Sequence, residues 1–163
     1  MQKKNLVICY TEFSSPDELT NDDKRLLEEA ITIGKSAYAP YSHYHVGASV
    51  LLSDGQMVHG NNQENMAFPS GLCAERVALF AASANHPGVP VVAIAIAAAS
   101  REFPVVEPVT PCGACRQAMI EYENLQTNPI RLILGCESGK TIIVESVGDL
   151  LPLSFKEEKL KRQ

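Results

Sequence analysis

The sequence lacks a long hydrophobic run. Its most apolar stretch, residues 89–99, is about half the length of the ~20 residues that a membrane helix needs. Residues 1–13 contain Lys3 and Lys4 but reach Thr11 and Glu12 too soon to hold the apolar core of a secretory signal. We therefore expect a cytoplasmic protein that does not associate with a membrane.

The sequence also lacks a surplus of basic residues. Its formal net charge is −5, whereas proteins that follow a nucleic-acid backbone present a face rich in lysine and arginine. Basic residues gather only near the C-terminus, interleaved with Glu157 and Glu158, and such a mixture is typical of a solvated helix or tail. The members of this cluster are Lys156, Lys159, Lys161 and Arg162. We therefore expect no nucleic-acid polymer as a partner.

A disulfide framework is missing as well. The cysteines are odd in number and we expect no secretory signal before them, so we consider metal binding or catalysis as their role. Neither a second C-x-x-C nor an H-x-x-x-H occurs in the sequence. Cys9 and Cys136 stand in apolar, strand-like text, and we expect both to be small core residues. The others are Cys73, Cys112 and Cys115.

The length of 163 residues and the hydrophobic content of 45% suit one compact domain. Apolar periodicity and turn signals predict helices over residues 21–39, 73–85 and 112–123, with a short helix at 147–152. They predict strands over residues 46–53, 56–62, 91–99, 131–136 and 141–146. This order gives an α/β fold, a three-layer α/β/α sandwich with a five-stranded mixed sheet. We assign residues 20–163 to this domain and residues 1–19 to an N-terminal arm of unknown role.

The pair Cys112 and Cys115 begins a predicted helix, whose N-terminus stabilises a thiolate. A redox dithiol, a structural metal and a catalytic metal all use such a pair. A structural zinc commonly has a second close pair of ligands, which this sequence does not offer. Cys73 begins another helix, and Glu75 follows it by two residues. Three thiolates would leave the fourth position of a zinc ion to water, with Glu75 facing that water.

Three thiolates around Zn²⁺ leave a net charge of −1, which weakens the metal as a Lewis acid. Something positive must compensate for this charge. Each helix N-terminus supplies roughly half an elementary charge. Arg76 or Arg116 could also donate a hydrogen bond to a thiolate sulfur, and we favour Arg76.

C-A-E at residues 73–75 and P-C-x-x-C at residues 111–115 form the three-cysteine signature of zinc-dependent nucleoside deaminases. The chain resembles the small homotetrameric cytidine deaminases from about Leu26 to Phe155, through AYAPYS, VGA, NQEN, CAER, PCGACRQ and LLP. The resemblance implies one Zn²⁺ per chain, and deamination of cytidine and deoxycytidine to uridine and deoxyuridine in pyrimidine salvage. Glu75 would take a proton from the zinc-bound water, hydroxide would attack C4, and Glu75 would pass protons to N3 and the departing amine.

The resemblance also implies a set of substrate contacts. Asn62 and Glu64 match the Asn-x-Glu that grips the sugar 3′-hydroxyl, and the Ala74 carbonyl matches the group that recognises the 4-amino group. Tyr44 stands where relatives carry a phenylalanine packed on the pyrimidine, so the role of its hydroxyl is open. Phe68 replaces a tyrosine near the sugar 5′ end. Phe155 matches an aromatic that reaches into a neighbouring subunit's site, so we expect a homotetramer with shared active sites.

Other functions share parts of this pattern. An antibiotic deaminase of the blasticidin type differs at the sugar motif, and deaminases of tRNA or single-stranded DNA usually read H-A-E and carry a basic channel. A dCMP deaminase would need a basic cluster for the phosphate. A structural zinc protein or a redox dithiol protein gives no reason for Glu75. The sequence leaves the preference between cytidine and deoxycytidine open.

Overall fold

The computed structural model describes residues 1–160, and within them six strands form one mixed sheet. The strands are β1 (Thr11–Phe13), β2 (Tyr44–Leu52), β3 (Met57–Asn61), β4 (Val91–Ser100), β5 (Arg131–Gly135) and β6 (Thr141–Val144). The helices are α1 (Asn21–Gly34), α2 (Ala74–Asn85) and α3 (Gly113–Glu123), with a short 3₁₀ helix, η3 (Val147–Leu150), after β6. The α/β class and the positions of the three main helices are confirmed. The first helix ends at Gly34 and not at residue 39, because the N–H groups of residues 35–37 bond to carbonyls three residues earlier and form turns.

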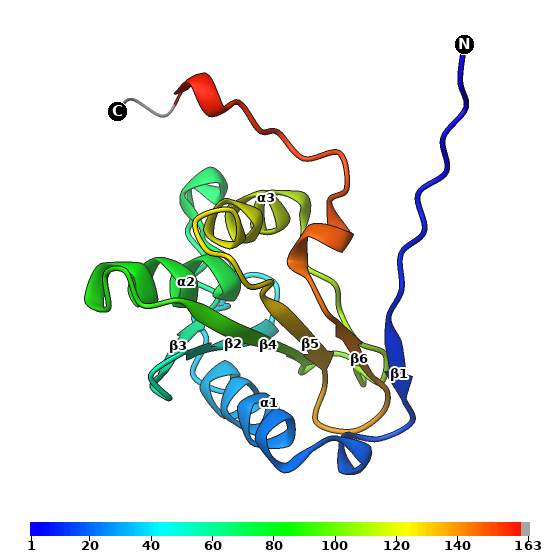
Figure 1. Ribbon diagram of the computed structural model, residues 1–163. Coiled ribbons are helices and arrows are strands. Elements are labelled where there is room, and N and C mark those ends of the chain that lie inside the picture. The colour runs from blue at the N-terminus through cyan, green and yellow to red at the C-terminus, as the bar shows by residue number, and fades with distance from the viewer. Residues whose placement is uncertain (161–163) are drawn as a thin grey trace.

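The sheet is covered on both faces. Its strand order is β1-β6-β5-β4-β2-β3, in which β4 and β5 are parallel and the other neighbours are antiparallel. Helix α1 covers one face, and α2 and α3 cover the other (Figure 1). The predicted three layers and the parallel pair β4-β5 are therefore present.

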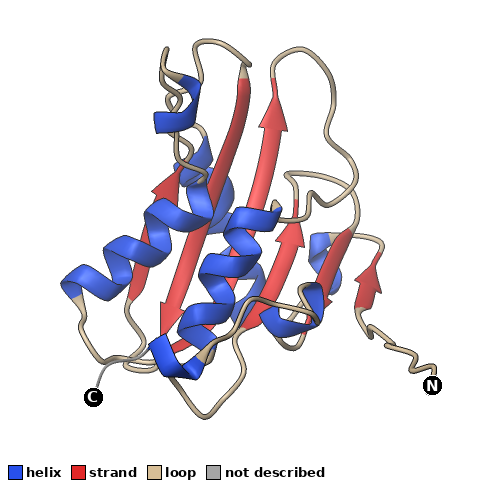
Figure 2. Cartoon of the chain, turned by 90° about the horizontal axis from the view of Figure 1, so that it is seen from above, coloured by secondary structure: helices blue, strands red, loops and turns tan. Residues whose placement is uncertain are grey.

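The prediction of five strands is wrong, because the N-terminal segment adds a sixth. Thr11 pairs with Ile143 and Phe13 with Thr141, which places β1 beside β6 at the edge of the sheet. Figure 2 shows this short strand close to the N-terminus. The apolar run at residues 6–10 has a higher β-propensity than residues 11–13, but residues 11–13 are the ones that pair. A strand needs a neighbour to bond with, and single-sequence propensity does not contain that neighbour.

Strand β4 shows why its sequence is continuously apolar. Ala93, Ala95 and Ala97 belong to the cluster beneath α1, while Ile94 and Ile96 belong to the cluster beneath α2 and α3. Alternate side chains of a strand point to opposite faces, so a strand covered on both sides must be apolar at every position. The small alanines leave room for α1 against its face of the sheet.

Helix α1 begins where the sequence predicts. The Thr20 hydroxyl accepts a hydrogen bond from the Asp23 backbone N–H at 3.2 Å and donates one to the Asp23 carboxylate at 2.9 Å. The Arg131 guanidinium on β5 donates to both carboxylate oxygens of Asp23, at 3.0 and 3.1 Å. The cap therefore also ties the start of α1 to the sheet.

Gly60 on β3 sets how closely α2 approaches the sheet. A Cβ atom at this position would lie 2.4 Å from the Ala78 backbone nitrogen and 2.8 Å from the Ala74 carbonyl oxygen. We expect Gly60→Ala to lower the free energy of unfolding by about 1–3 kcal/mol, because backbone must move to admit the methyl group. Denaturant titration measures the change. An unaltered midpoint would show that α2 can shift away from β3 without loss.

The structure also tests the expectations about membrane helices and about the burial of Cys9 and Cys136. No helix within residues 1–160 is long and apolar enough to cross a membrane. Cys136 is buried as expected, but Cys9 is exposed, because the run that contains it lies outside the sheet. Lys161 and Arg162 of the C-terminal basic cluster lie outside the described residues.

Candidate metal and substrate site

Two helix N-termini bring three thiols together. Cys73 is the N-cap residue of α2, Cys112 is the N-cap residue of α3, and Cys115 lies one turn into α3. The Sγ atoms of Cys73 and Cys112 are 4.0 Å apart, and those of Cys112 and Cys115 are 3.5 Å apart. All three Sγ atoms lie within 4.8 Å of one another.

These distances suit a tetrahedral zinc ion. A Zn–S bond of about 2.3 Å in tetrahedral geometry separates two sulfur ligands by about 3.8 Å. Three cysteines at such separations are soft donors of the kind zinc prefers, and they leave a fourth position open. The donor set therefore fits one zinc ion per chain at an open site.

Arg76 contributes positive charge at the cluster. Its Nη2 donates a hydrogen bond to Cys73 Sγ over 4.0 Å. A hydrogen bond from the Cys115 thiol is the largest effect that lowers the pKa of Cys73, to about 5, and Arg76 and Cys112 act in the same direction. The hydrogen bond to Cys73, together with burial, raises the pKa of Cys115. Of these two coupled thiols, Cys73 is therefore the one that ionises more readily.

Arg116, the alternative to Arg76, serves a different purpose. Its Nε donates to the Pro111 carbonyl at 2.7 Å, and its Nη1 donates to the Leu150 carbonyl at 3.0 Å. Its Nη2 donates to Thr110 Oγ1 at 3.2 Å. Arg116 thus ties the loop before α3 to the segment after β6 and supports the position of the two cysteines on α3.

Glu75 lies in the first turn of α2 and is 5% exposed. Burial is the largest cause that raises the pKa of its carboxyl group, and the nearby Cys73 adds to this. The carboxyl also interacts with the Cys115 thiol, which opposes the rise. The site thus holds a desolvated carboxyl group beside the three thiols, an environment that suits a group exchanging protons near neutral pH.

A cavity of about 470 Å³ lies beside Cys73. Its lining includes Asn62, Glu64 and Phe68, three of the residues that the resemblance assigns to substrate. The ring of Tyr41 meets that of Phe68 edge to face, with centroids 5.9 Å apart. The cavity therefore has an aromatic wall, a polar wall and a thiol at its margin.

Backbone pairing holds the polar wall beside the thiols. Gln63 exchanges two hydrogen bonds with Leu72, each 2.9 Å long, and Leu72 directly precedes Cys73. On the other side, the Glu64 N–H donates to the Tyr38 carbonyl at 2.8 Å. The segment that contains Asn62 and Glu64 is thus fixed to the residue before Cys73.

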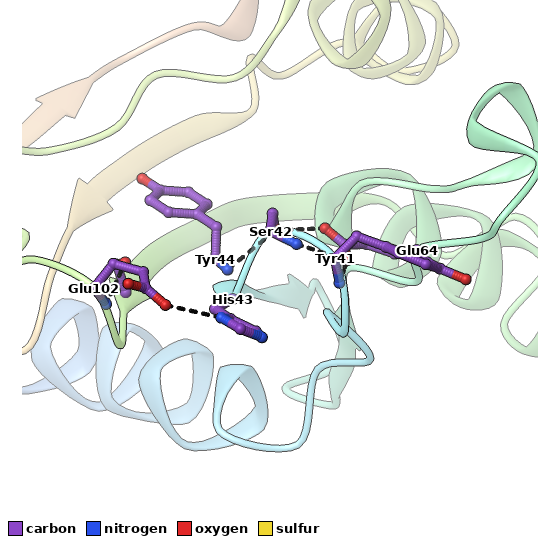
Figure 3. Close-up of polar contacts among 7 residues, drawn as sticks. Tyr41, Ser42, His43, Tyr44, Glu64 and Glu102 are labelled. Atoms are coloured by element: carbon purple, nitrogen blue, oxygen red, sulfur yellow. Dashed lines mark hydrogen bonds and ion pairs between the residues drawn. The ribbon is translucent and has the colours of Figure 1, made fainter.

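The loop before β2 orients Glu64, as Figure 3 shows. The Tyr41 N–H donates to Glu64 Oε2 at 2.9 Å, the Ser42 N–H donates to the same atom at 3.3 Å, and the Ser42 hydroxyl bonds Oε1. The Ser42 hydroxyl bond is the largest cause that lowers the pKa of Glu64. The carboxylate is therefore ionised and fixed in orientation.

Asn62 is held by the start of β2. Its Oδ1 accepts from the Val46 N–H at 2.8 Å, and its Nδ2 donates to the Tyr44 carbonyl at 2.9 Å. A side-chain amide has a second hydrogen and a second lone pair, and a carboxylate has about four acceptor positions. Asn62 and Glu64 therefore keep hydrogen-bonding capacity toward the cavity after their structural bonds are made.

The other residues that we predicted to bind substrate lie outside the lining of this cavity. Tyr44 packs its ring against Phe103 at 6.2 Å between centroids and points away from Glu64 (Figure 3). Ala74 is fully buried at the start of α2. Phe155 is 70% exposed beyond η3, although its backbone exchanges two hydrogen bonds of 3.1 Å with the Gln117 side chain.

Sequence reasoning missed Tyr41, Ser42 and Phe103 as parts of this region. The motif AYAPYS contains the first two, but nothing in the sequence shows that their N–H groups point at a carboxylate 22 and 23 residues later. Phe103 stands in a loop, and only the structure places its ring beside Tyr44.

Comparison with known proteins agrees with this geometry. The family described as "Cytidine and deoxycytidylate deaminase zinc-binding region" matches residues 20–127. A cytidine deaminase of Halalkalibacterium halodurans is 40% identical over 137 residues, which cover 84% of this chain and 96% of the relative. One of Sporosarcina psychrophila is 39% identical over 140 residues, which cover 85% of this chain and 95% of the relative.

Solved structures share the fold. The crystal structure of cytidine deaminase from Burkholderia pseudomallei is 39% identical and superposes with a TM-score of 0.71, covering 84% of this chain and all of that one. Cytidine deaminase from Mycobacterium tuberculosis is 29% identical with a TM-score of 0.62, over 85% of this chain. With this coverage, and with its three thiols grouped as a zinc site requires, the chain belongs to the cytidine and deoxycytidylate deaminase zinc-binding family.

Proposed function

We propose that this chain hydrolyses cytidine and deoxycytidine to uridine and deoxyuridine, releasing ammonia. One observation carries the proposal: the buried carboxyl of Glu75 lies beside three thiols grouped for zinc, next to a cavity of nucleoside-binding size. This reaction suits pyrimidine salvage. The relatives' names support it, since the proteins that cover most of this chain are cytidine deaminases. A cytoplasmic location stays a prediction, as does the division into an arm (residues 1–19) and a catalytic domain (residues 20–163).

The mechanism divides the chemistry between the metal and the chain. Cys73, Cys112 and Cys115 would hold the zinc ion, which would supply Lewis acidity and make a nucleophile derived from water accessible near neutral pH. Glu75 would remove one proton of the attacking water and deliver it to N3 of the pyrimidine. It would then take the second proton from the hydroxyl group added at C4 and deliver it to the amine, which departs as ammonia. Its burial supports this role, because a carboxyl group with a raised pKa both accepts and returns a proton readily.

The polar wall orients the sugar in this proposal. The remaining amide hydrogen of Asn62 and the remaining acceptor position of Glu64 suit a hydroxyl group, which accepts one hydrogen bond and donates another. The Ala74 carbonyl would recognise the 4-amino group, while Tyr44 and Phe68 would lie against the base and the sugar 5′ end. Arg76 would hold the charge of Cys73 through the hydrogen bond it already donates.

The direct experiment follows ultraviolet absorbance after mixing the purified, zinc-loaded protein with cytidine, deoxycytidine, dCMP or adenosine. Loss of the cytidine signal with equal ammonia release supports the proposal. The zinc content of the same sample is measured alongside. Turnover of dCMP alone, or full zinc content without turnover of any substrate, would contradict the assignment of the cavity to a nucleoside.

Replacement of Glu64 tests the polar wall. We expect Glu64→Gln to raise KM for cytidine about 10- to 100-fold with a smaller change in kcat, because an amide cannot accept all the bonds that fix this carboxylate. Glu102→Gln is the matched control, since Glu102 lies in a neighbouring loop and pairs with His43 at 2.8 Å on the surface. Equal KM values for both variants would remove Glu64 from the substrate site.

We also propose a homotetramer in which Phe155 reaches a neighbouring subunit's site. The exposed ring of Phe155 and the two hydrogen bonds between its backbone and the Gln117 side chain support this role, because the backbone is held in place while the ring can enter a partner. We expect Phe155→Ala to lower kcat/KM by about tenfold or more, while the zinc content of each chain stays unchanged. Steady-state kinetics measures kcat/KM, metal analysis measures the zinc content, and sedimentation measures the oligomeric state. A tetrameric variant with unchanged activity would refute the proposal.

A further inference from the structure

Residues 1–10 precede β1 as an extended segment that runs away from the rest of the chain (Figure 1). Four large apolar side chains in this segment face solvent: Leu6 is 64% exposed, Val7 83%, Ile8 46% and Tyr10 59%. Exposure of so much apolar surface in a row is unfavourable in water, and these residue types favour strands. The segment thus has the composition of a β-strand that is not paired within its own chain.

The sheet offers an edge in direct continuation of this segment. Strand β1 is the last strand of the sheet and pairs with β6 on one side. Within residues 1–160, no strand pairs with its other side. Residues 4–12 thus form one extended stretch with an unpaired edge. Such an edge exposes N–H and C=O groups that can bond to another strand.

The sequence of this stretch is complementary to itself when read in the antiparallel direction. If Ile8 is opposite Ile8 of a second copy, Leu6 is opposite Tyr10 and Lys4 is opposite Glu12 at both ends. The remaining pairs are Val7 with Cys9 and Asn5 with Thr11. Apolar residues thus meet apolar residues and opposite charges meet, which stabilises cross-strand pairs. Glu12 already lies 3.6 Å from Lys140, so its carboxylate would be shared by two lysines.

Other registers lose this match. If one copy shifts by one residue along the other, even-numbered residues of one strand lie opposite odd-numbered residues of the other, so the even-numbered residues of the two copies point to opposite faces of the sheet. With Cys9 at the centre, Leu6 would be opposite Glu12, and with Val7 at the centre, Lys4 would be opposite Tyr10. The pairing centred on Ile8 is therefore the one that matches apolar and charged positions together.

The register centred on Ile8 also matches the faces of the two strands. Phe13 packs against the cluster beneath α1, so alternate residues of the same strand, among them Leu6, Ile8 and Tyr10, point to the other face if β1 continues outward. The register centred on Ile8 places each of these residues opposite another of the same face. The three side chains from each copy would then form one apolar stripe, with Lys4 and Glu12 at its ends.

We propose that residues 4–12 pair antiparallel with the same residues of a second copy of this chain. The contact is isologous and closed, and it joins the two sheets through their β1 edges. The matched family region begins only at residue 20, so this interface belongs to the chain's own N-terminal segment and does not depend on the proposed function.

Disulfide trapping in the full-length, zinc-loaded protein tests the register. Cysteines are placed singly at residue 8 and at residue 6 in a Cys9→Ser background, giving Ile8→Cys/Cys9→Ser and Leu6→Cys/Cys9→Ser. Directly opposite residues have Cα atoms about 4.5–5.5 Å apart, within reach of a disulfide. The two copies of residue 6 would be separated by four residues along the strand, about 13 Å, which is too far.

With a mild oxidant, we expect a covalent dimer from the residue 8 variant and no more than the Cys9→Ser background from the residue 6 variant. Equal trapping of both variants, or of neither, would overturn the proposal. Unchanged zinc content in all three proteins shows that Cys73, Cys112 and Cys115 were not oxidised.

Hydrogen exchange gives a second measurement that does not depend on cysteine. We expect alternate amides among residues 5–11, those that bond to the partner strand, to be protected in the unaltered protein. They should exchange about tenfold faster in Ile8→Lys, because that change places two like charges opposite each other. The amides of α2 should not change. Unprotected exchange of residues 5–11 in the unaltered protein would overturn the proposal.

Discussion

Glu75→Gln should bind zinc at about one ion per chain and fold as the unaltered protein does, yet deaminate cytidine about a thousandfold more slowly. Glutamine has the shape of glutamate but cannot accept and return a proton. The buried position favours an uncharged side chain, so the substitution should not destabilise α2. Zinc analysis, thermal unfolding and absorbance kinetics on one preparation measure the three quantities.

Glu121→Gln is the matched control for this experiment. Glu121 lies on α3 and is exposed, so the same chemical change should leave zinc content and turnover unaffected. If Glu75→Gln kept near-normal turnover, the group that moves protons would have to be another residue, and the proposed mechanism would be wrong. If it lost zinc, the carboxyl group would be part of the metal site.

Cys112→Ala should remove the metal and the activity together. The two remaining thiols, on different helices, cannot hold zinc with the affinity of three. We expect zinc to fall from about one per chain to near none and kcat/KM to fall by at least about a thousandfold. The melting temperature should also fall, because a metal that binds only the folded chain stabilises it.

Cys9→Ser is the control for Cys112→Ala. Its thiol is exposed on the N-terminal segment and lies outside the cluster of three. Zinc content and turnover should equal those of the unaltered protein. Full zinc occupancy in Cys112→Ala would mean that another residue replaces the lost ligand, and the three-cysteine assignment would need revision.

The local parts of the site could be predicted because they depend on short spacings. Cys112 and Cys115 are one helical turn apart, and Glu75 follows Cys73 by two residues at the start of another helix. A helix fixes the relative directions of such residues wherever it is placed in the fold. Capping also acts locally, and the start of α1 at Thr20 was predicted for that reason.

The sixth strand could not be predicted in the same way. Residues 6–10 have the stronger β-propensity, but residues 11–13 are the ones that reach β6. Pairing depends on where the chain passes next to an existing edge, and a run of residues cannot specify this alone. The exposure of Cys9 has the same cause.

The polar wall of the cavity could be predicted only in part. Asn62 and Glu64 were identified through the resemblance, but their hydrogen bonds to the loop before β2 come from residues far away in the sequence. The same applies to Tyr44, whose ring lies against Phe103. Such contacts depend on the register of β2 against β3 and β4, which sequence spacing does not reveal.

The sequence by itself therefore determined which residues we propose as metal ligands and as the proton-transfer group, the helices that carry them and the layered α/β class, because helical spacing, capping and apolar periodicity are local. Only the tertiary structure decided that Cys73 lies 4.0 Å from Cys112, a residue 39 positions away. It also decided the number of strands and the orientation of Glu64 beside the cavity. These features depend on how sheet pairing brings distant segments together, and that pairing is a property of the whole fold.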